Sequence, residues 1–298
     1  STPSNSSAAS DVYKRQDLFH LLKLMRQRHL EVHLITNGLL LTPQIMAALK
    51  QSGTRVMISI DGASPETYES IRQGSDFDQV LQAARSCAKQ GLLEAINFTI
   101  LKDNYTEIPG ILELAASIGA PKVTFIGLKP CHNYPEELLS PIEYGEAIEL
   151  TCQAAQKTGV DFFFDEPFFW ATVKDRGLMA RMPAEGAGIV ATSTTACAFG
   201  DYLFIEPNGE VKPCSFAQLV LGNVNDKPLD QIWSEARSSP LVQKIKDPKT
   251  KTGYCQSCPY LEDCKGCRSR TFALTGDWFA SDPVCPLGTK SATARDLK

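Results

Sequence analysis

CQSCPYLEDCKGC, at residues 255–267, is the densest run of cysteines in the chain and has the spacing C-x2-C-x5-C-x2-C. Working outward, Cys214 and Cys197 precede it and Cys285 follows it, so seven of the ten cysteines lie in the last third of the sequence. Iron–sulfur clusters are held by sets of cysteine thiolates, and a C-x2-C step brings two sulfurs to one cluster. Seven thiolates exceed the needs of one four-coordinate ion. The spacing therefore predicts a metal domain that holds iron–sulfur clusters.

Three other interpretations of the cysteines compete with this one. Structural zinc also takes sets of four cysteines arranged in C-x2-C pairs. Disulfides suit small secreted domains, but this chain has 298 residues and a group of seven leaves one thiol unpaired. Isolated core cysteines account for Cys87, Cys131 and Cys152, which lie in or beside apolar runs. They do not account for the dense group, so structural zinc is the main alternative.

Composition excludes several classes of function. Hydrophobic residues make up 43% and charged residues 21%, which is typical of a globular protein. The net charge of −4 gives no basic face for nucleic acid. No apolar run approaches the roughly 18 residues of a membrane span. Clustered thiols without a visible signal peptide predict a reducing cytoplasm.

The first sixteen residues differ from the rest of the chain. Residues 1–16 are rich in Ser, Thr and Asn and show no periodicity, and an amphipathic helical pattern begins abruptly after them. We expect residues 1–16 to be a disordered or non-native tail that takes no part in the fold.

Helices and strands alternate from Asp17 onward. Helical periodicity begins at Leu18, Thr42-Pro43 and Ser64-Pro65 supply capped helix starts, and further helices are predicted from Phe77, Ile108 and Pro141. Strand-like runs lie between them, at residues 31–35, 55–60, 95–101 and 122–126, with 161–164 as a possible fifth. Such alternation predicts a parallel α/β sheet or barrel.

Polar residues follow three of these strands, at 36–38, 59–62 and 102–104. Loops at the carboxyl ends of parallel strands build active sites, although Asn-Gly and Asp-Gly are also ordinary turn sequences. The aromatic segment 162–170 is predicted to be core or domain-packing surface. Asp165 and Glu166 within it are expected to form a solvated turn before Pro167, with acid–base work as the alternative.

From Asp17 to about residue 286 the chain resembles the radical S-adenosylmethionine enzymes that carry a C-terminal SPASM domain. The resemblance rests on C-x11-G-x4-C from Cys197 to Cys214, the run at 255–267 and the final Cys285. Between the cysteines lie IEPNGEV at 205–211, LGNV at 221–224 and IW at 232–233, which are similar to the family's intervening elements. A zinc ribbon has no need of these elements.

The resemblance implies a fold and a domain order. ITNG at 35–38 looks like the family's third-strand motif, and SIDG at 59–62 looks like its fourth. The implied fold is α/β: a partial (β/α)6-type barrel at 17–160, a bridging region at 161–196, and a small cysteine-rich α+β SPASM domain at 197–298. Carried over, the motifs implicate Thr36, Asn37, Ser59 and Asn97 in binding S-adenosylmethionine, since hydroxyl and amide groups can bond its ribose and amino-acid end.

One family motif is absent from the sequence. The C-x3-C-x2-C loop that holds the cofactor-cleaving cluster does not occur, and the earliest cysteine is Cys87. The expectation is that the first strands of the barrel are missing. S-adenosylmethionine and a third cluster are therefore expected only in a full-length parent, and the chain as given is expected to be inactive.

The resemblance also divides the seven cysteines into two groups. Cys255, Cys258, Cys264 and Cys285 would hold one auxiliary 4Fe–4S cluster completely. The remaining thiols, Cys197, Cys214 and Cys267, would hold a second cluster that lacks a fourth thiolate. Its open iron would take Asp201, water or a substrate atom.

The implied function is that of a radical enzyme that modifies a peptide or protein side chain through hydrogen abstraction by a 5′-deoxyadenosyl radical. The auxiliary clusters would transfer electrons or ligate substrate, and flavodoxin or ferredoxin would supply reducing power. Two alternatives stay open: modification of heme or another small-molecule tetrapyrrole, and a non-catalytic iron–sulfur electron-transfer or binding module.

Overall fold

The computed structural model describes residues 17–129, 135–181 and 197–288. Two compact units interleave along the chain. The first comprises residues 1–126, 150–164 and 181–190, and the second comprises 127–149, 165–180 and 191–298. Each unit is described by itself below. The predicted tail at 1–16 lies outside the described residues.

The first unit is built on a parallel sheet with the strand order β1-β2-β3-β4-β5. The strands are β1 (His33–Thr36), β2 (Arg55–Ser59), β3 (Leu93–Ile100), β4 (Lys122–Gly127) and β5 (Asp161–Asp165). β1 pairs with β2 and β2 with β3 in parallel register. All five predicted strands are confirmed. Their ends differ from the predicted ends by no more than two residues.

Helices connect the strands: α1 (Leu18–Gln27), α2 (Pro43–Ser52), α3 (Pro65–Ile71), α4 (Phe77–Lys89), α5 (Ile108–Ile118) and α6 (Pro141–Thr158). The predicted caps are present. The Thr42 hydroxyl accepts the Ile45 N–H at 3.3 Å, and the Ser64 hydroxyl accepts the Thr67 N–H at 3.2 Å. Each cap satisfies one of the backbone donors that a helix start leaves free.

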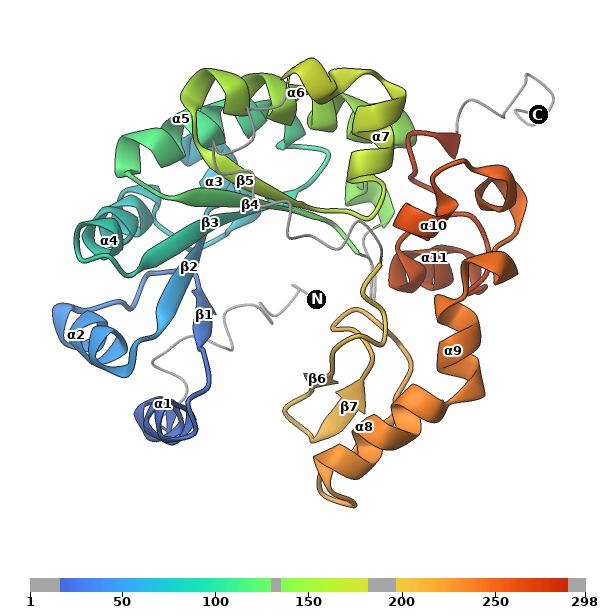
Figure 1. Ribbon diagram of the computed structural model, residues 1–298. Helices are drawn as coiled ribbons and strands as arrows, with labels where there is room; N and C mark the ends of the chain where they lie inside the picture. The colour runs from blue at the N-terminus through green and yellow to red at the C-terminus, as the bar shows by residue number, and fades with distance from the viewer. Residues whose placement is uncertain (1–16, 130–134, 182–196, 289–298) are drawn as a thin grey trace. The chain divides into compact units, whose positions relative to one another are not determined.

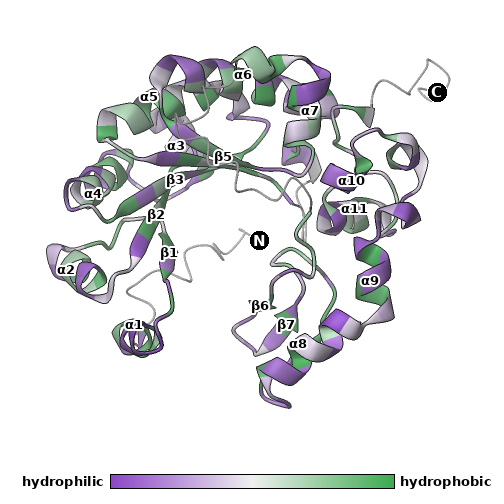
Figure 2. Cartoon of the chain, viewed as in Figure 1, coloured by the Kyte–Doolittle hydropathy of each residue, from purple (hydrophilic) through white to green (hydrophobic). Residues whose placement is uncertain are grey.

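Side chains on the two faces of the sheet differ. Ile58 and its register partner Ile96 are fully buried, as is Phe98 on the same face of β3, and helices pack along the sheet (Figure 1). Figure 2 shows hydrophobic colouring along β3, while the helices alternate between hydrophobic and polar surfaces. Because side chains alternate along a strand, Ser59 and Asn97 point to the opposite face. That face carries the polar residues at the carboxyl ends of the strands.

The second unit contains the cysteines and has a small sheet of its own. Strands β6 (Phe204–Ile205), β7 (Glu210–Lys212) and β8 (Gly222–Asn223) pair antiparallel. The helices are α7 (Phe169–Asp175), α8 (Leu229–Ser238), α9 (Pro240–Lys246), α10 (Leu261–Cys264) and α11 (Arg268–Thr275). A local core forms where Phe199, Ala217 and Ile245 pack with Cys197 and Cys214. A parallel α/β sheet followed by a small cysteine-rich α+β region confirms the predicted fold class.

Short 3-10 segments complete the described chain, at Tyr105–Glu107, Pro135–Glu137, Leu178–Arg181, Pro248–Thr250 and Gly253–Ser257. The segment predicted as a bridging region contains β5 and α7, and the domain limits at 160 and 197 stay predictions. Among the described helices, none has the length and apolar character that crossing a membrane requires.

Candidate metal centres

Four cysteine thiols surround one cavity in the second unit. Cys255, Cys258, Cys264 and Cys285 line one hollow of about 10 Å³, together with Tyr254, Ala171, Leu261, Lys265, Gly266, Asp282 and Leu287. This grouping is the four-cysteine set that the resemblance implies. Within the described residues, no three His, Cys, Asp or Glu side chains converge as closely as a single metal ion requires. Four thiols around one hollow are the donor set that a 4Fe–4S cluster takes.

Local backbone structure places these four sulfurs. Cys255 lies in the 3-10 segment Gly253–Ser257, and its N–H donates to the Ser281 hydroxyl at 2.9 Å. The Cys258 N–H donates to the Cys255 carbonyl at 3.2 Å, which closes the first C-x2-C step. Cys264 ends α10, and the Cys285 N–H donates to the Asp282 carbonyl at 3.1 Å. Burial raises the pKa of the Cys285 thiol to about 12. Cys285 therefore favours the neutral thiol until a metal displaces its proton.

The second C-x2-C step turns the chain between the two thiol groups. Lys265 and Gly266 both have positive φ, at 61° and 62°. This conformation is costly for lysine and free for glycine. The Gly266 N–H points back to the Cys264 sulfur at 3.4 Å. Cys264 thus lines the four-thiol cavity, whereas Cys267 caps the start of α11 and is not among the residues that line it.

The remaining thiols, Cys197, Cys214 and Cys267, form a second group. Burial is the main cause of the raised pKa of the Cys197 thiol, and Cys214 raises it further. Burial likewise raises the pKa of Cys267, with an added contribution from Cys197. Each thiol therefore lies within electrostatic range of another member of the group. Backbone N–H groups of Phe199 and Arg268 hydrogen-bond to the Cys197 sulfur, as they do around cluster sulfurs.

The described contacts of Asp201 do not involve the three-thiol group. Its carboxylate pairs with the Lys246 ammonium. The neighbouring Tyr202 instead hydrogen-bonds to the Cys214 thiol, and its hydroxyl accepts the Ser215 N–H at 3.4 Å. Burial, followed by this contact with Cys214, raises the pKa of Tyr202.

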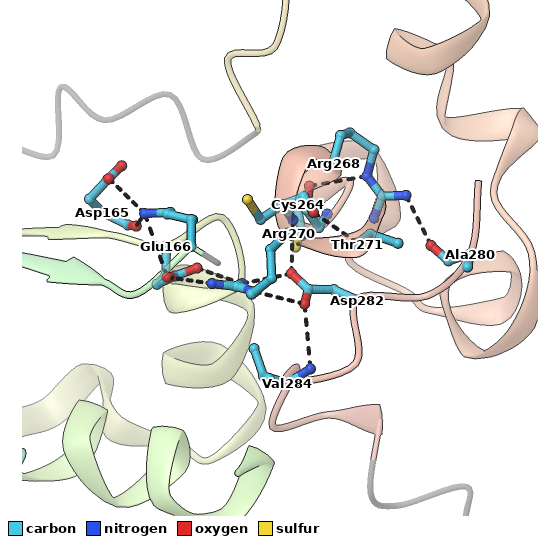
Figure 3. Close-up of polar contacts among 12 residues, drawn as sticks. Asp165, Glu166, Cys264, Arg268, Arg270, Thr271, Ala280, Asp282 and Val284 are labelled. Carbon is cyan, nitrogen blue, oxygen red and sulfur yellow. Dashed lines mark hydrogen bonds and ion pairs between the residues drawn. The ribbon is translucent and has the colours of Figure 1, made fainter. Parts of the chain in front are cut away.

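A buried ion network lies beside both thiol groups (Figure 3). The Arg270 guanidinium binds Glu166 through two hydrogen bonds of 2.7 Å, and it binds Asp282 at 2.7 and 3.1 Å. All three side chains are fully buried. The expectation that Glu166 belongs to a solvated turn is wrong. Its partner follows 104 residues later, so no local pattern could reveal the pair.

Asp282 connects this network to the thiols. One carboxylate oxygen accepts the Cys267 N–H at 2.9 Å, and the other accepts the Val284 N–H at 3.4 Å, next to Cys285. Arg270 holds the pKa of the Asp282 carboxyl below its usual range, although burial alone would raise it. One ionised carboxylate thus fixes the backbone beside a member of each thiol group.

Lys129 and Gly127 complete the surroundings of Glu166. The Lys129 ammonium donates to the Asp165 carbonyl and carboxylate, both at 2.8 Å, and lies 3.6 Å from a Glu166 oxygen. A Cβ added at Gly127 would lie 1.7 Å from the same Glu166 oxygen. The glycine is required because the backbone passes so close to the buried carboxylate.

The predicted cofactor-binding residues lie at the carboxyl ends of β1, β2 and β3 in the first unit. Ser59 is the register partner of Asn97, and Thr36 is the partner of Ile58. The Thr36 hydroxyl accepts a hydrogen bond from the Gly38 N–H at 3.1 Å. The side-chain amide oxygen of Asn37, Oδ1, accepts one from the Leu39 N–H at 3.2 Å. These two side chains therefore stabilise the turn, which was the alternative interpretation of this loop.

Asn97 is the polar group at this edge that fits a ligand best. It is buried, and its side-chain oxygen has no hydrogen-bond partner among the described residues. A buried acceptor without a donor costs free energy, so a ligand with an N–H or O–H group would satisfy it. By contrast, Asn104 in the third polar loop is fully bonded to the Asp61 and Thr99 carbonyls at 3.0 and 2.9 Å.

Comparisons with known proteins find two families along the chain. Residues 8–115 match the model of the Radical SAM superfamily, and residues 197–268 match that of the SPASM iron–sulfur cluster-binding domain. The chain is 29% identical to an AdoMet-dependent heme synthase of Methanosarcina barkeri, covering 91% of this chain and 78% of that one. It is 28% identical to a PqqA peptide cyclase of Granulibacter bethesdensis, covering 92% and 71%. Among solved structures, anSMEcpe with bound AdoMet and Cp18Cys peptide superposes with a TM-score of 0.68 at 18% identity, covering 93% and 78%.

Proposed function

Because this chain belongs to the radical SAM enzymes that carry a SPASM domain, we propose that it modifies a peptide or protein side chain through a 5′-deoxyadenosyl radical. Two auxiliary 4Fe–4S clusters, at the four-thiol and three-thiol groups, would take up the electron that leaves the substrate. A flavodoxin- or ferredoxin-type reductant and a cytoplasmic location are parts of this proposal.

The observation that carries the proposal is the division of the seven cysteines. Four of them share one cavity, and each of the other three lies within electrostatic range of another member of its group. When bound, such clusters supply one-electron acceptors whose potentials respond to charge, hydrogen bonds and exposure. The protein's own contribution is to hold the thiols, to exclude water through burial, and to fix the backbone at Cys267 and Cys285 through Asp282.

A second candidate is modification of a tetrapyrrole. The heme synthase relatives favour it, since one of them covers 91% of this chain at 29% identity. The peptide candidate is supported by the PqqA peptide cyclase at 28% identity over 92% of the chain. The two candidates share the cluster assignment and differ only in the substrate.

Product formation separates the two candidates. The full-length protein, reconstituted with iron and sulfide and reduced with dithionite, is given S-adenosylmethionine together with either iron-coproporphyrin III or a synthetic short peptide encoded beside its gene. We expect the peptide to raise 5′-deoxyadenosine formation at least about tenfold and to lose hydrogen atoms in mass spectra. Stimulation by the porphyrin alone would establish the second candidate. Intact clusters with no stimulation by either substrate would favour an electron-transfer module.

Binding of S-adenosylmethionine tests the role of the strand ends. Replacing Asn97 with alanine removes the unsatisfied buried acceptor, and Ser59→Ala removes its neighbour's hydroxyl. Each change should weaken S-adenosylmethionine binding by about five- to thirtyfold, since a hydrogen bond lost in a buried site costs about 1–2 kcal/mol. Asn104→Ala breaks only internal bonds and serves as the control. Unchanged dissociation constants in equilibrium dialysis for both Asn97→Ala and Ser59→Ala would rule out these contacts.

A further inference from the structure

Arg268 is a buried cation without a carboxylate partner. Its side chain is 1% exposed, and its nitrogens donate to the carbonyls of Gly266, Trp278 and Ala280 at 3.3, 2.8 and 2.9 Å. The remaining nitrogen, Nη2, has no hydrogen-bond partner in the part of the chain that the structure describes. No described carboxylate lies within ion-pair distance of the guanidinium. Arg268 thus keeps its full charge in the interior.

Lys251 is a second cation of the same kind. It is 2% exposed, and its ammonium donates to the carbonyls of Ile245 and Asp247 at 2.7 and 2.8 Å and to the Thr250 hydroxyl at 3.1 Å. The carboxylate of Asp247 instead accepts the Lys249 N–H at 2.9 Å. Burial and the nearby Arg268 lower the pKa of Lys251 to about 8. Two cations therefore occupy one region, and neither has a described carboxylate within ion-pair distance, although Asp282 lies in electrostatic range of Arg268 and Asp247 in that of Lys251.

Both cations lie beside the three-thiol group. Arg268 directly follows Cys267, and its own N–H hydrogen-bonds to the Cys197 sulfur. The Lys251 ammonium is bound to the carbonyl of Ile245, whose side chain belongs to the small core that packs against Cys197 and Cys214. Trp278, whose carbonyl accepts from Arg268, packs against the same core. The local geometry brings the two charges and the thiols together.

The four-thiol cavity has different electrostatic surroundings. Its charged lining residues are Lys265 and Asp282. Lys265 is partly exposed, so water screens its charge. Asp282 shares the single positive charge of Arg270 with Glu166, so these three side chains together keep a net negative charge. Apart from neighbouring thiols, Asp282 is the charged group that acts on Cys264 and Cys285, whereas the cation Arg268 acts on Cys197 of the three-thiol group.

A buried charge without a counter-charge costs several kcal/mol, so proteins rarely keep one. An anion at the three-thiol group would remove that cost. A 4Fe–4S cluster with three thiolates is such an anion, because the thiolate charges outweigh the core. We propose that Arg268 and Lys251 are the counter-charges of this cluster and give it a higher reduction potential than the cluster in the four-thiol cavity. The inference rests on the cluster assignment proposed above.

Redox titration followed by electron paramagnetic resonance tests the inference on the reconstituted full chain. Arg268→Gln removes the charge and keeps a hydrogen-bond donor, while Arg268→Lys keeps the charge and is the matched control. Lys251→Gln is a second neutral variant. A Cys258→Ala background removes the four-thiol cluster and isolates the signal of the other. At a fixed potential, Arg268→Gln should lower the reduced-to-oxidised ratio of the three-thiol cluster about tenfold, equal to about 59 mV for one electron.

Each outcome is decisive. A shift in Arg268→Gln and Lys251→Gln, with Arg268→Lys close to wild type, supports the inference. Loss of iron from the three-thiol group in Arg268→Gln but not in Arg268→Lys supports it too, because only the first of these variants removes the positive charge. Unchanged potentials with both clusters present, or equal shifts of the two clusters, overturn it. Absence of cluster signals from the wild-type chain would instead refute the proposed function.

Discussion

Replacing Arg270 with methionine should lower the free energy of unfolding by about 3–5 kcal/mol. The change leaves two fully buried carboxylates, Glu166 and Asp282, without the guanidinium that pairs with both. The rings of Tyr144 and Phe168, at 5.6 and 5.4 Å from the guanidinium, offer no replacement charge. For a chain of this size, the midpoint of thermal denaturation of the reconstituted protein should fall by roughly 6–10 °C.

Lys157→Met is the matched control for burial. Lys157 pairs with Glu113 at 2.9 Å, a distance similar to those of Arg270, but both side chains are exposed. Such surface pairs contribute about 0–1 kcal/mol, so the midpoint should move by no more than about 2 °C. Adding Glu166→Gln and Asp282→Asn to Arg270→Met removes the stranded charges and should recover part of the loss. Equal small shifts for Arg270→Met and Lys157→Met would contradict the assigned role of the network.

Replacing Cys258 with alanine should remove about four irons per chain, which is half of the auxiliary iron expected from two four-iron clusters. Cys258 shares its cavity with three other thiols, and a complete cluster has no spare ligand at this position. The measurement is iron and acid-labile sulfide on anaerobically reconstituted protein. Stoichiometric zinc in the wild-type chain, without the broad visible absorption of clusters, would show that structural zinc is the correct reading.

Asp201→Ala is the control for the same experiment. Because the Asp201 carboxylate pairs with Lys246, its removal should leave the iron content within about half an iron of wild type. Tyr202→Phe should likewise retain iron, since it removes only the hydroxyl beside Cys214. Iron loss from Asp201→Ala equal to that from Cys258→Ala would make Asp201 a ligand after all.

Local sequence was sufficient to predict most elements of the fold. Thr42-Pro43 and Ser64-Pro65 stand where the structure starts α2 and α3, because a cap and its helix lie within four residues of each other. The grouping of Cys255, Cys258 and Cys264 came from the family resemblance, because short spacing alone would also include Cys267. Strand ends shifted by a residue or two because hydrogen bonding to neighbouring strands, not propensity, decides where a strand ends.

The buried charges could not be predicted in this manner. Glu166 follows an aromatic strand and precedes a proline, and this sequence pattern is also typical of a surface turn. Only Arg270 and Asp282, distant in sequence, make it a buried ion pair. Arg268 gives no signal at all, since an arginine after a cysteine is ordinary. One clue was present: Gly127 ends β4 where a larger residue would meet Glu166, but a glycine at a strand end is usually explained by a turn.

The bridge between Glu166 and Arg270 also sets an order of assembly. Its two partners are 104 residues apart, and contacts of such separation form late because a long loop must close first. During synthesis, the segments around β5 and α7 leave the ribosome well before α11 and Cys285. The second unit therefore cannot form this ion pair before Arg270 has been synthesised, and its set of cysteines is incomplete until Cys285 follows. Insertion of a cluster at the four-thiol group would then follow translation of the chain as far as Cys285. Proteins that deliver iron and sulfide would bind a chain whose parallel sheet is already formed.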